Sequence, residues 1–449
     1  MDLKGKAHCV YKRIIEKDAS FLTDFFALSD KKRKEILEQL DAKALECLTN
    51  IIKTSKQKIF DEHHKKFLEI ASANINTPVY LIDETLVEEN MKVLRYVKDR
   101  TGCKILHALK AYATFATFPI MRKYLDGVCA SGLNEARLGF EKFKKEVHTF
   151  GAAYKHEDME DIIRYSDVLI FNSFYQLENF GNLAKEKGKG VGIRVNPGYS
   201  DIKVEIYNPC APYSRLGIIY EIFKKQYNKF SHIIDGLHFH ALCEQNADSL
   251  ERVLDSFKKL FGPFLMKNKN LKWVNFGGGH HITRDDYDIE LLISLIRDFK
   301  RDFKVQVYLE PGEASVLNAG VLIATVLDIV ENKKKIAIID ASAEAHMPDV
   351  LLMPYRPYVL NSSEEEKKQH DYRIGGPSCL AGDIIGDYFF DKPLKPGDKI
   401  VFKDMALYTI VKNTTFNGIN LPDIAVIKKS GEIKVIKSFG YRDYLSRQS

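Results

Sequence analysis

The feature that most constrains the fold is a regular alternation of strand-like and helix-like segments from Cys103 onward. Short apolar, β-branched runs are each followed by a helical or loop stretch, which predicts parallel strands joined by crossovers. Eight such units are the number that closes a (β/α)₈ barrel. The predicted strands are 104–109, 126–130, 147–151, 167–171, 191–196, 234–239, 272–276 and 305–310.

The pattern of predicted elements changes beyond residue 325. Strand-like runs such as "KKIAIIDAS", "KIVFKDMALYTIV" and "IKVIKSFG" are separated by turns such as "KPGD", without a long helical pattern. This pattern predicts a second, antiparallel β domain. The predicted fold is therefore α/β, with a TIM-type barrel over 73–325 and a C-terminal antiparallel β domain over 326–449. An exposed loop is expected at 361–371.

The first 72 residues are predicted to be a helical extension. Ser29 or Asp30 is suited to cap the helix "KKRKEILEQL", and "ALECLTNIIK" continues with helical spacing. No motif in 1–72 points to chemistry. We expect these helices to pack on the body of the protein or on a partner, and their role is left open.

Composition excludes several classes of protein. The net charge is +6 over 449 residues, and basic residues alternate with acidic ones, which is not typical of a nucleic-acid-binding stripe. No apolar run reaches the roughly 18 residues of a membrane span, and no signal peptide is predicted. The seven cysteines form no CxxC pair. We therefore expect a cytoplasmic protein that binds neither membrane nor nucleic acid.

Four chemically distinctive groups follow four of the predicted barrel strands. Lys110 follows the first strand, His240 the sixth, the glycines at 277–279 the seventh, and Glu310 the eighth. The carboxyl ends of barrel strands carry the chemistry in this fold. A lysine near a buried strand end is costly unless it is paired or used. Together the four groups match the needs of pyridoxal 5′-phosphate (PLP): an amine for its aldehyde, a glycine cradle, a stacking ring and a pyridine partner.

A metal centre is the main chemical alternative at these strand ends. His238 and His240 lie two apart on one strand and face the same way, and His280 and His281 follow the glycines. No carboxylate completes a recognisable ligand spacing with them, so no metal is predicted.

Several ordered motifs make the chain similar to a known family. "HALKA", "GLHFH", "FGGG", "EPGEA" and "GGPSCLAGD" resemble the alanine-racemase-like PLP decarboxylases, which include the ornithine and diaminopimelate decarboxylases. Within this family, the resemblance is strongest to the carboxynorspermidine decarboxylases, through "SGLNEARLG", "YNPCAPYSRLG" and "HMPDVLLMPYRP". It covers about residues 75–449 and does not extend to 1–72.

The resemblance implies roles for particular residues. Lys110 would carry PLP, His240 would stack on its ring, Glu310 would meet the pyridine nitrogen, and Tyr408 would lie near the cofactor. Gly277, Gly278 and Gly279 would hold the phosphate. The strand 79–83 would belong to the β domain.

The resemblance also implies a head-to-tail homodimer with active sites formed between subunits. Cys379 and Asp383 would then arrive from the partner subunit, with Cys379 as the proton donor to Cα after carbon dioxide leaves. A small buried hydrophobic cysteine is the alternative reading of Cys379. Its place in a loop between glycines favours the acid role.

The sequence departs from the family at one informative position. Ornithine and diaminopimelate decarboxylases usually carry an arginine after "EPG", whereas this chain has Glu313. The reversed charge favours a cationic substrate over one with a second carboxylate. The predicted reaction is therefore decarboxylation of carboxynorspermidine or carboxyspermidine in polyamine biosynthesis. Candidate partners for the polyamine tail are Glu244, Glu313 and Asp383.

Other functions remain in competition with this one. Diaminopimelate decarboxylase is the main alternative within the class, and a PLP-binding homologue without activity is a further one. Amino-acid racemisation needs a tyrosine base in the second domain, where this sequence has Cys379. The preference between carboxynorspermidine and carboxyspermidine is left open.

Overall fold

The computed structural model describes residues 10–73, 75–360, 362 and 370–449, and the chain divides into two compact units. The first unit consists of Met1–Lys56, Asn90–Lys110 and Phe118–Ser315. The second consists of Gln57–Glu89, Ala111–Thr117 and Val316–Ser449.

The first unit contains a closed barrel of eight parallel strands, which confirms the predicted fold. Each strand pairs with its sequence neighbours, and β9 closes the ring by pairing with β2. All eight predicted strands are present, with ends that differ by up to two residues. The strands are β2 (Lys104–Ala108), β3 (Gly127–Ala130), β4 (Glu146–Phe150), β5 (Val168–Phe171), β6 (Gly190–Arg194), β7 (Gly236–His238), β8 (Trp273–Asn275) and β9 (Gln306–Leu309).

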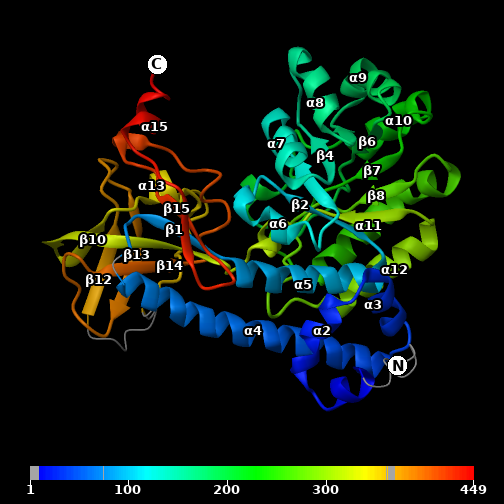
Figure 1. Ribbon diagram of the computed structural model, residues 1–449. Helices are drawn as coiled ribbons and strands as arrows, with labels where there is room; N and C mark the ends of the chain where they lie inside the picture. Colours follow the sequence, from blue (N-terminus) through cyan, green and yellow to red (C-terminus); the bar gives the residue numbers. More distant parts are fainter. Residues whose placement is uncertain (1–9, 74, 361, 363–369) are drawn as a thin grey trace. The chain divides into compact units, whose positions relative to one another are not determined.

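Helices α7–α12 lie outside the barrel strands (Figure 1). In α12, apolar residues recur at Ile289, Leu292, Ile293 and Ile296, so one face of the helix is buried. The carboxylate of Asp288 caps the helix by accepting the Leu291 N–H at 2.9 Å. The helices are α5 (Glu84–Thr101), α6 (Phe118–Met121), α7 (Leu133–Leu138), α8 (Met159–Tyr165), α9 (Phe174–Glu186), α10 (Tyr220–Phe230), α11 (Ala247–Lys267) and α12 (Ile289–Phe303).

Trp273, the single tryptophan of the sequence, fills the barrel interior. It packs with Leu106 and Tyr308 in a buried cluster. A Cβ on Gly192 would lie 2.3 Å from the Trp273 ring, and one on Gly236 would lie 2.1 Å from it. These two glycines of neighbouring strands therefore make the space that the indole occupies.

The second unit is built on a mixed, mainly antiparallel sheet. Its strands run in the order β13-β12-β11-β10-β1-β15-β16, and β14 also pairs with β10. The pairs β1–β15 and β11–β12 are parallel. The strands are β1 (Val79–Asp83), β10 (Gly320–Asn332), β11 (Lys334–Ile339), β12 (His370–Gly375), β13 (Ile384–Phe390), β14 (Lys399–Lys403), β15 (Asp423–Ile427) and β16 (Ile433–Lys437).

Several sequence expectations can be compared with this sheet. The strand expected at 79–83 is β1, and it belongs to the β domain. The boundary expected at 325/326 falls inside β10. The strand expected to continue through 404–411 is wrong, because Asp404 and Tyr408 have positive φ values of 61° and 49°, which end the extended conformation. Short helices are α13 (Ala343–His346), α14 (Asp349–Leu352) and α15 (Tyr441–Leu445).

The N-terminal segment is helical, with α2 (Leu22–Ala27), α3 (Asp30–Leu37) and α4 (Ala42–Ser72). Ser29 is the N-cap residue of α3, although its side chain makes no capping hydrogen bond. The division between the two units falls within α4. Most of the loop expected at 361–371 lies outside the described residues. Among the described helices, none is long and apolar enough to cross a membrane.

Candidate active site

The four groups singled out in the sequence lie on four consecutive strands of the barrel. Lys110 follows β2, Glu310 follows β9, Gly277 follows β8, and His240 follows β7. Since β7, β8, β9 and β2 are neighbours around the ring, these groups converge at one arc of its carboxyl end. All four belong to the first unit.

Lys110 sits two residues beyond the end of β2, and its side chain is exposed within the chain. Its positive charge acts on Cys129, Glu135 and His240, which shows that the amine lies within electrostatic range of the other groups. The amine is thus accessible to a reactant at the carboxyl end of the barrel.

Glu310 is a buried carboxylate held in a fixed orientation. The Asn275 amide donates to Glu310 Oε1 at 2.7 Å, and His238 Nε2 lies 3.3 Å from Oε2. Burial alone would raise the pKa of Glu310, but the nearby His238 and His148 and the hydrogen bond from Asn275 outweigh it and lower the pKa to about 2. Glu310 is therefore ionised at neutral pH and able to hold a protonated ring nitrogen.

His240 is a neutral imidazole. Burial, followed by the nearby charge of Lys110, holds its pKa well below the usual value. The Gly278 N–H donates to His240 Nδ1 at 3.0 Å, so this nitrogen is an acceptor and carries no proton. A flat, uncharged ring fixed in this way is suited to stack on an aromatic cofactor.

The glycines at 277–279 allow three strand ends to meet. A Cβ on Gly277 would lie 2.5 Å from the Phe239 carbonyl oxygen, and one on Gly278 would lie 2.4 Å from that of Glu310. The N–H groups of Gly277 and Gly278 already donate to Asn275 and His240. The phosphate role of the three glycines stays a prediction. The N–H groups of Gly277 and Gly278 already have an acceptor, so they are less available to a phosphate.

Three further residues complete the site: Asn275 and Arg194 were not selected from the sequence, and His238 was considered there only as a metal ligand. His238 and Asn275 orient Glu310, as described above. Arg194, at the end of β6, is buried, and burial lowers its pKa to about 10. Its guanidinium lies 4.6 Å from the centroid of the Phe150 ring. Each of the three is a polar residue at or beside a strand end, which is the sequence feature that could have indicated it. Their contacts, however, depend on the register between strands.

The metal alternative has a geometric basis that the sequence did not reveal. The ligand atoms of His238, His240 and Glu310 lie within 4.8 Å of one another. No sequence spacing connects Glu310 with the histidines, but β9 brings it close to β7 in space. The prediction of no metal stays a prediction.

Two of the candidate substrate carboxylates lie in the first unit. Glu244 is exposed in the segment between β7 and α11 and has a positive φ of 54°. Glu313 Oε2 lies 3.8 Å from Nε2 of His281. Burial lowers the pKa of His281 to about 4, so this histidine is neutral at pH 7 and does not cancel the charge of Glu313.

Asp383, the third candidate, lies in the second unit and is 3% exposed. Its carboxylate accepts hydrogen bonds from the Ser342 hydroxyl at 2.8 Å, the Ala343 N–H at 2.7 Å and the Ser378 N–H at 3.3 Å. These bonds hold the turn before Cys379. The predicted contact of Asp383 with a substrate tail stays a prediction.

Cys379 and Tyr408 also belong to the second unit. Cys379 is exposed, and its N–H donates to Asn417 Oδ1 at 2.7 Å. The Tyr408 N–H donates at 2.9 Å to the carbonyl of Ala111, the residue that follows Lys110 in the chain. Their predicted catalytic and cofactor roles stay predictions.

The chain is similar to known proteins in both sequence and structure. The sequence model of the family described as pyridoxal-dependent decarboxylase, C-terminal sheet domain, matches residues 25–406. A carboxynorspermidine/carboxyspermidine decarboxylase of Campylobacter jejuni is 45% identical over 384 residues, covering 83% of this chain and 98% of the relative. A carboxyaminopropylagmatine decarboxylase of Synechocystis is 38% identical, covering 84% and 96%.

The structural comparison agrees with the sequence comparison. The crystal structure of carboxynorspermidine decarboxylase with norspermidine from Campylobacter jejuni superimposes with a TM-score of 0.77 at 44% identity. It covers 83% of this chain and all of the other. A diaminopimelate decarboxylase of Archaeoglobus fulgidus is more distant, at 25% identity over 405 residues, covering 83% of this chain and 93% of the relative. The chain therefore belongs to the pyridoxal-dependent decarboxylases.

Proposed function

We propose that this chain removes the carboxylate of carboxynorspermidine and carboxyspermidine, with PLP held at the carboxyl end of the barrel in the first unit. The observation that carries the choice of substrate is Glu313, an acidic residue next to a neutral histidine where an arginine would favour a dicarboxylate. The 45% identical relative named for these two substrates supports the choice.

The residues of the first unit fit the cofactor. Lys110 supplies an accessible amine for the aldehyde, and His240 supplies a neutral ring with its Nδ1 already fixed by Gly278. Glu310 supplies an ionised carboxylate for the pyridine nitrogen. A Cβ at 277–279 would meet neighbouring backbone, so only glycine fits this turn, and we assign the turn to the phosphate. When bound, PLP supplies an electron sink for the pair left at Cα by departing carbon dioxide.

Each residue then has a defined task. The amine of Lys110 would hold the cofactor through its aldehyde. Glu310, an anion whose Oε1 accepts a hydrogen bond from Asn275, would hold the proton on the pyridine nitrogen. A proton must reach Cα after carbon dioxide leaves, and we assign its delivery to Cys379 of the partner subunit in a homodimer. Tyr408 is assigned to the surroundings of the cofactor.

Substrate choice follows from the charge at the far end of the molecule. Diaminopimelate carries a carboxylate there, which calls for an arginine clamp. Carboxynorspermidine carries amines there, which call for carboxylates such as Glu244 and Glu313, with Asp383 as a third candidate. A charge-assisted hydrogen bond contributes about 1.5–3 kcal/mol, enough for roughly ten- to hundredfold selectivity.

A second candidate substrate is carboxyaminopropylagmatine. The Synechocystis relative named for it is 38% identical, close to the value for the polyamine enzymes. Its cationic tail would also suit acidic residues. Diaminopimelate is disfavoured, because the relatives named for it are only 24–26% identical.

The test compares four substrates on the purified holoenzyme: carboxynorspermidine, carboxyspermidine, carboxyaminopropylagmatine and meso-diaminopimelate. We expect kcat/KM to be highest for one of the first two, with product identified by mass spectrometry. Borohydride reduction and peptide mapping should place the pyridoxyl group on Lys110. A preference for meso-diaminopimelate, or a label on another lysine, would show the assignment to be wrong.

The variant Glu313→Arg tests the charge argument directly. It should lower kcat/KM for carboxynorspermidine by roughly ten- to hundredfold and weaken the preference over meso-diaminopimelate. Glu157→Arg is the matched control, because Glu157 is exposed in the short helix His156–Asp158 before α8, and no candidate site residue lies in that helix. Equal effects of both variants would show that Glu313 does not select the substrate.

A further inference from the structure

The segment between β8 and α12 connects the two loops that carry the acidic candidates Glu244 and Glu313. We call residues 280–288 the β8–α12 segment. It follows the glycines directly and ends at Asp288, the cap of α12. It lies entirely in the first unit.

One side of the β8–α12 segment is bonded to the loop that contains Glu244. Arg284 Nη1 donates to the Glu244 carbonyl at 3.1 Å, and the His281 N–H donates to the Gln245 carbonyl at 3.3 Å. The Asn246 side chain donates to the Asp286 carbonyl at 3.0 Å and accepts the Asp288 N–H at 2.8 Å. The backbone at Glu244, which has a positive φ, is thus held by this segment.

Another side of the segment contacts the turn that contains Glu313. The buried Thr283 hydroxyl donates to the Ala314 carbonyl at 2.7 Å. His281 Nε2 lies 3.8 Å from the Glu313 carboxylate. The position of both acidic residues therefore depends on the conformation of one short segment.

Helix α4 of the N-terminal extension contacts the middle of the same segment with two lysines. Lys53 Nζ donates to the Tyr287 carbonyl at 3.2 Å, and Lys56 Nζ lies 3.3 Å from Asp285 Oδ1. Lys56 is 3% exposed, so its ammonium has been removed from water to make its contacts. Burying an ammonium costs free energy unless it is paired, and this makes the contact specific.

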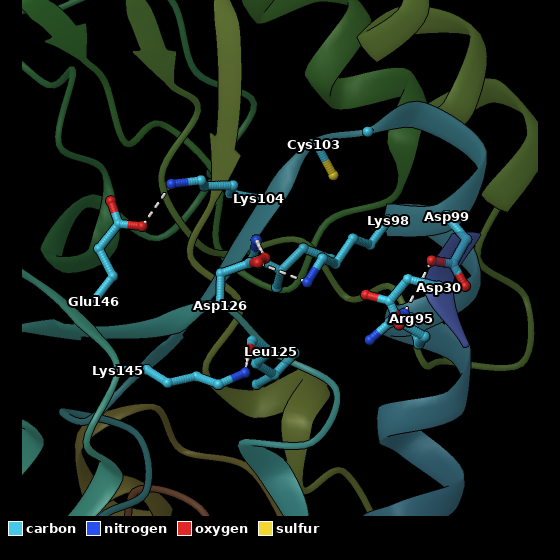
Figure 2. A network of polar contacts seen from close by, with 12 residues as sticks. Asp30, Arg95, Lys98, Asp99, Cys103, Lys104, Leu125, Asp126, Lys145 and Glu146 are labelled. Atoms are coloured by element: carbon cyan, nitrogen blue, oxygen red, sulfur yellow. Dashed lines mark hydrogen bonds and ion pairs between the residues drawn. The ribbon is translucent and has the colours of Figure 1, made fainter. Parts of the chain in front are cut away.

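The extension is anchored to the barrel unit elsewhere, so α4 has a fixed support. The Thr49 hydroxyl donates to Glu290 Oε1 at 2.5 Å at the start of α12. Figure 2 shows Asp30 of α3 beside Arg95 and Asp99 of α5. In the same cluster the buried Arg33 donates from Nε to Asp99 at 2.6 Å. The Thr49 contact holds α4 itself, and the contacts of Asp30 and Arg33 hold the preceding helix α3 to the same unit.

We propose that Lys53 and Lys56 are positioning residues for substrate selection, and that the extension serves to hold the β8–α12 segment. By fixing this segment, the two lysines fix Glu244 and Glu313 for a polycationic tail. This inference rests on the proposed polyamine substrate. The extension thereby gains a role in specificity, although it carries no catalytic group.

The test uses the full-length holoenzyme with Lys56→Met, which keeps an unbranched side chain one atom shorter and removes the charge. We expect KM for carboxynorspermidine and Kd for norspermidine to rise roughly three- to tenfold, with kcat within about twofold of wild type. Deuterium uptake in a peptide covering 280–288 should rise as well. Lys56→Arg should restore part of the affinity, and the exposed Lys58→Met on the same helix should change nothing.

The outcomes separate this inference from the proposed function. If wild type acts on carboxynorspermidine while Lys56→Met changes neither KM nor exchange, the inference is wrong. It is also wrong if exchange rises with KM unchanged, or if kcat falls with KM unaltered. Should Lys56→Met fail to fold, Asp285→Asn removes the partner from an exposed site instead and should raise KM in the same direction. If wild type does not act on a polyamine acid at all, it is the proposed function that fails.

Discussion

Asn275 is the residue that joins the two halves of the candidate cofactor site. Its amide nitrogen donates to Glu310 at 2.7 Å, and its amide oxygen accepts the Gly277 N–H at 2.9 Å. The side chain is fully buried. One planar group therefore sets both the direction of the carboxylate and the start of the glycine turn.

Replacing Asn275 with leucine should reduce activity strongly. Leucine has a similar volume but leaves Oε1 of Glu310 and the Gly277 N–H without their hydrogen-bond partner, at about 1–3 kcal/mol each. We expect the affinity for PLP to fall at least tenfold and kcat to fall by more than that. PLP titration followed by absorbance, together with kcat, measures both. The control Asn179→Leu, on the exposed face of α9, should have no effect. Normal PLP affinity in Asn275→Leu would contradict the role assigned to Asn275.

Single residues were predictable where chemistry alone makes them unusual. Lys110, His240 and Glu310 stand out because each is a polar group directly after an apolar run that reads as a barrel strand. Asn275 and His238 act on Glu310 through the register of β7, β8 and β9, in which His238 is opposite Asn275. No pattern within one strand reveals that pairing, so Asn275 was missed and His238 was considered only as a metal ligand.

At the scale of elements, α13 is built around one carboxylate. Asp383 accepts the first N–H of α13 and the Ser342 hydroxyl. A Cβ on Gly376 would lie 2.3 Å from Asp383 Oδ2, so the glycine leaves room for the carboxylate. Asp383 thereby links the start of α13 to the turn before Cys379.

Asp383→Asn should destabilise the protein, because the new amide presents N–H groups to backbone donors. An unmatched buried donor costs about 1–3 kcal/mol. Urea unfolding should show a loss of this size. Asp371→Asn, at an exposed ion pair with Lys334, should cost less than about 1 kcal/mol. A stable Asp383→Asn protein with raised KM would instead favour direct contact with the substrate tail.

His346, at the end of α13, should make stability depend on pH. Its Nδ1 accepts the Ser342 N–H at 3.1 Å, and burial lowers its pKa to about 4. The unfolded chain, with a histidine pKa near 6.5, binds the proton more readily, so stability is lost as pH falls from about 6.5 towards 4. Between pH 7.5 and 5 the loss from this group is about 2 kcal/mol.

The variant His346→Gln isolates this contribution, since glutamine accepts a hydrogen bond without titrating. Between pH 7.5 and 5, the free energy of unfolding should decrease in both proteins. The decrease should be about 2 kcal/mol smaller for His346→Gln than for wild type. His232→Gln, on an exposed site, should follow wild type. Parallel pH profiles for wild type and His346→Gln would exclude the histidine as a source of the dependence.

Elements were predictable where periodicity is strong and uncertain where the backbone turns. The eight barrel strands follow from apolar runs at regular intervals. The expected continuation of β14 failed because a positive φ at Asp404 depends on tertiary bonding, such as the Asn318 N–H that its carboxylate accepts at 2.6 Å. The mixed sheet likewise requires long-range pairing, as between β1 and β15.

At the scale of the whole molecule, the proposed residues divide between the two units. Lys110, His240 and Glu310 belong to the first unit, whereas Cys379 and Tyr408 belong to the second. The order of motifs in the sequence predicts this division, because the barrel ends before the β domain begins. Lys110 and Cys379 could meet within one chain or between two chains of a dimer. A complementation experiment with two inactive variants distinguishes these cases.

We predict that each active site is shared between two subunits. Lys110→Ala and Cys379→Ala should each be nearly inactive alone, because each removes one essential group from both sites of a dimer. After mixing and subunit exchange, half of the dimers are heterodimers, and each of these keeps one intact site. Activity should therefore recover to about a quarter of wild type. Mass spectrometry of differently tagged chains verifies the exchange. The double variant Lys110→Ala/Cys379→Ala mixed with wild type serves as the control for dilution of wild-type chains. Exchange without recovered activity would show that Lys110 and Cys379 act within the same chain.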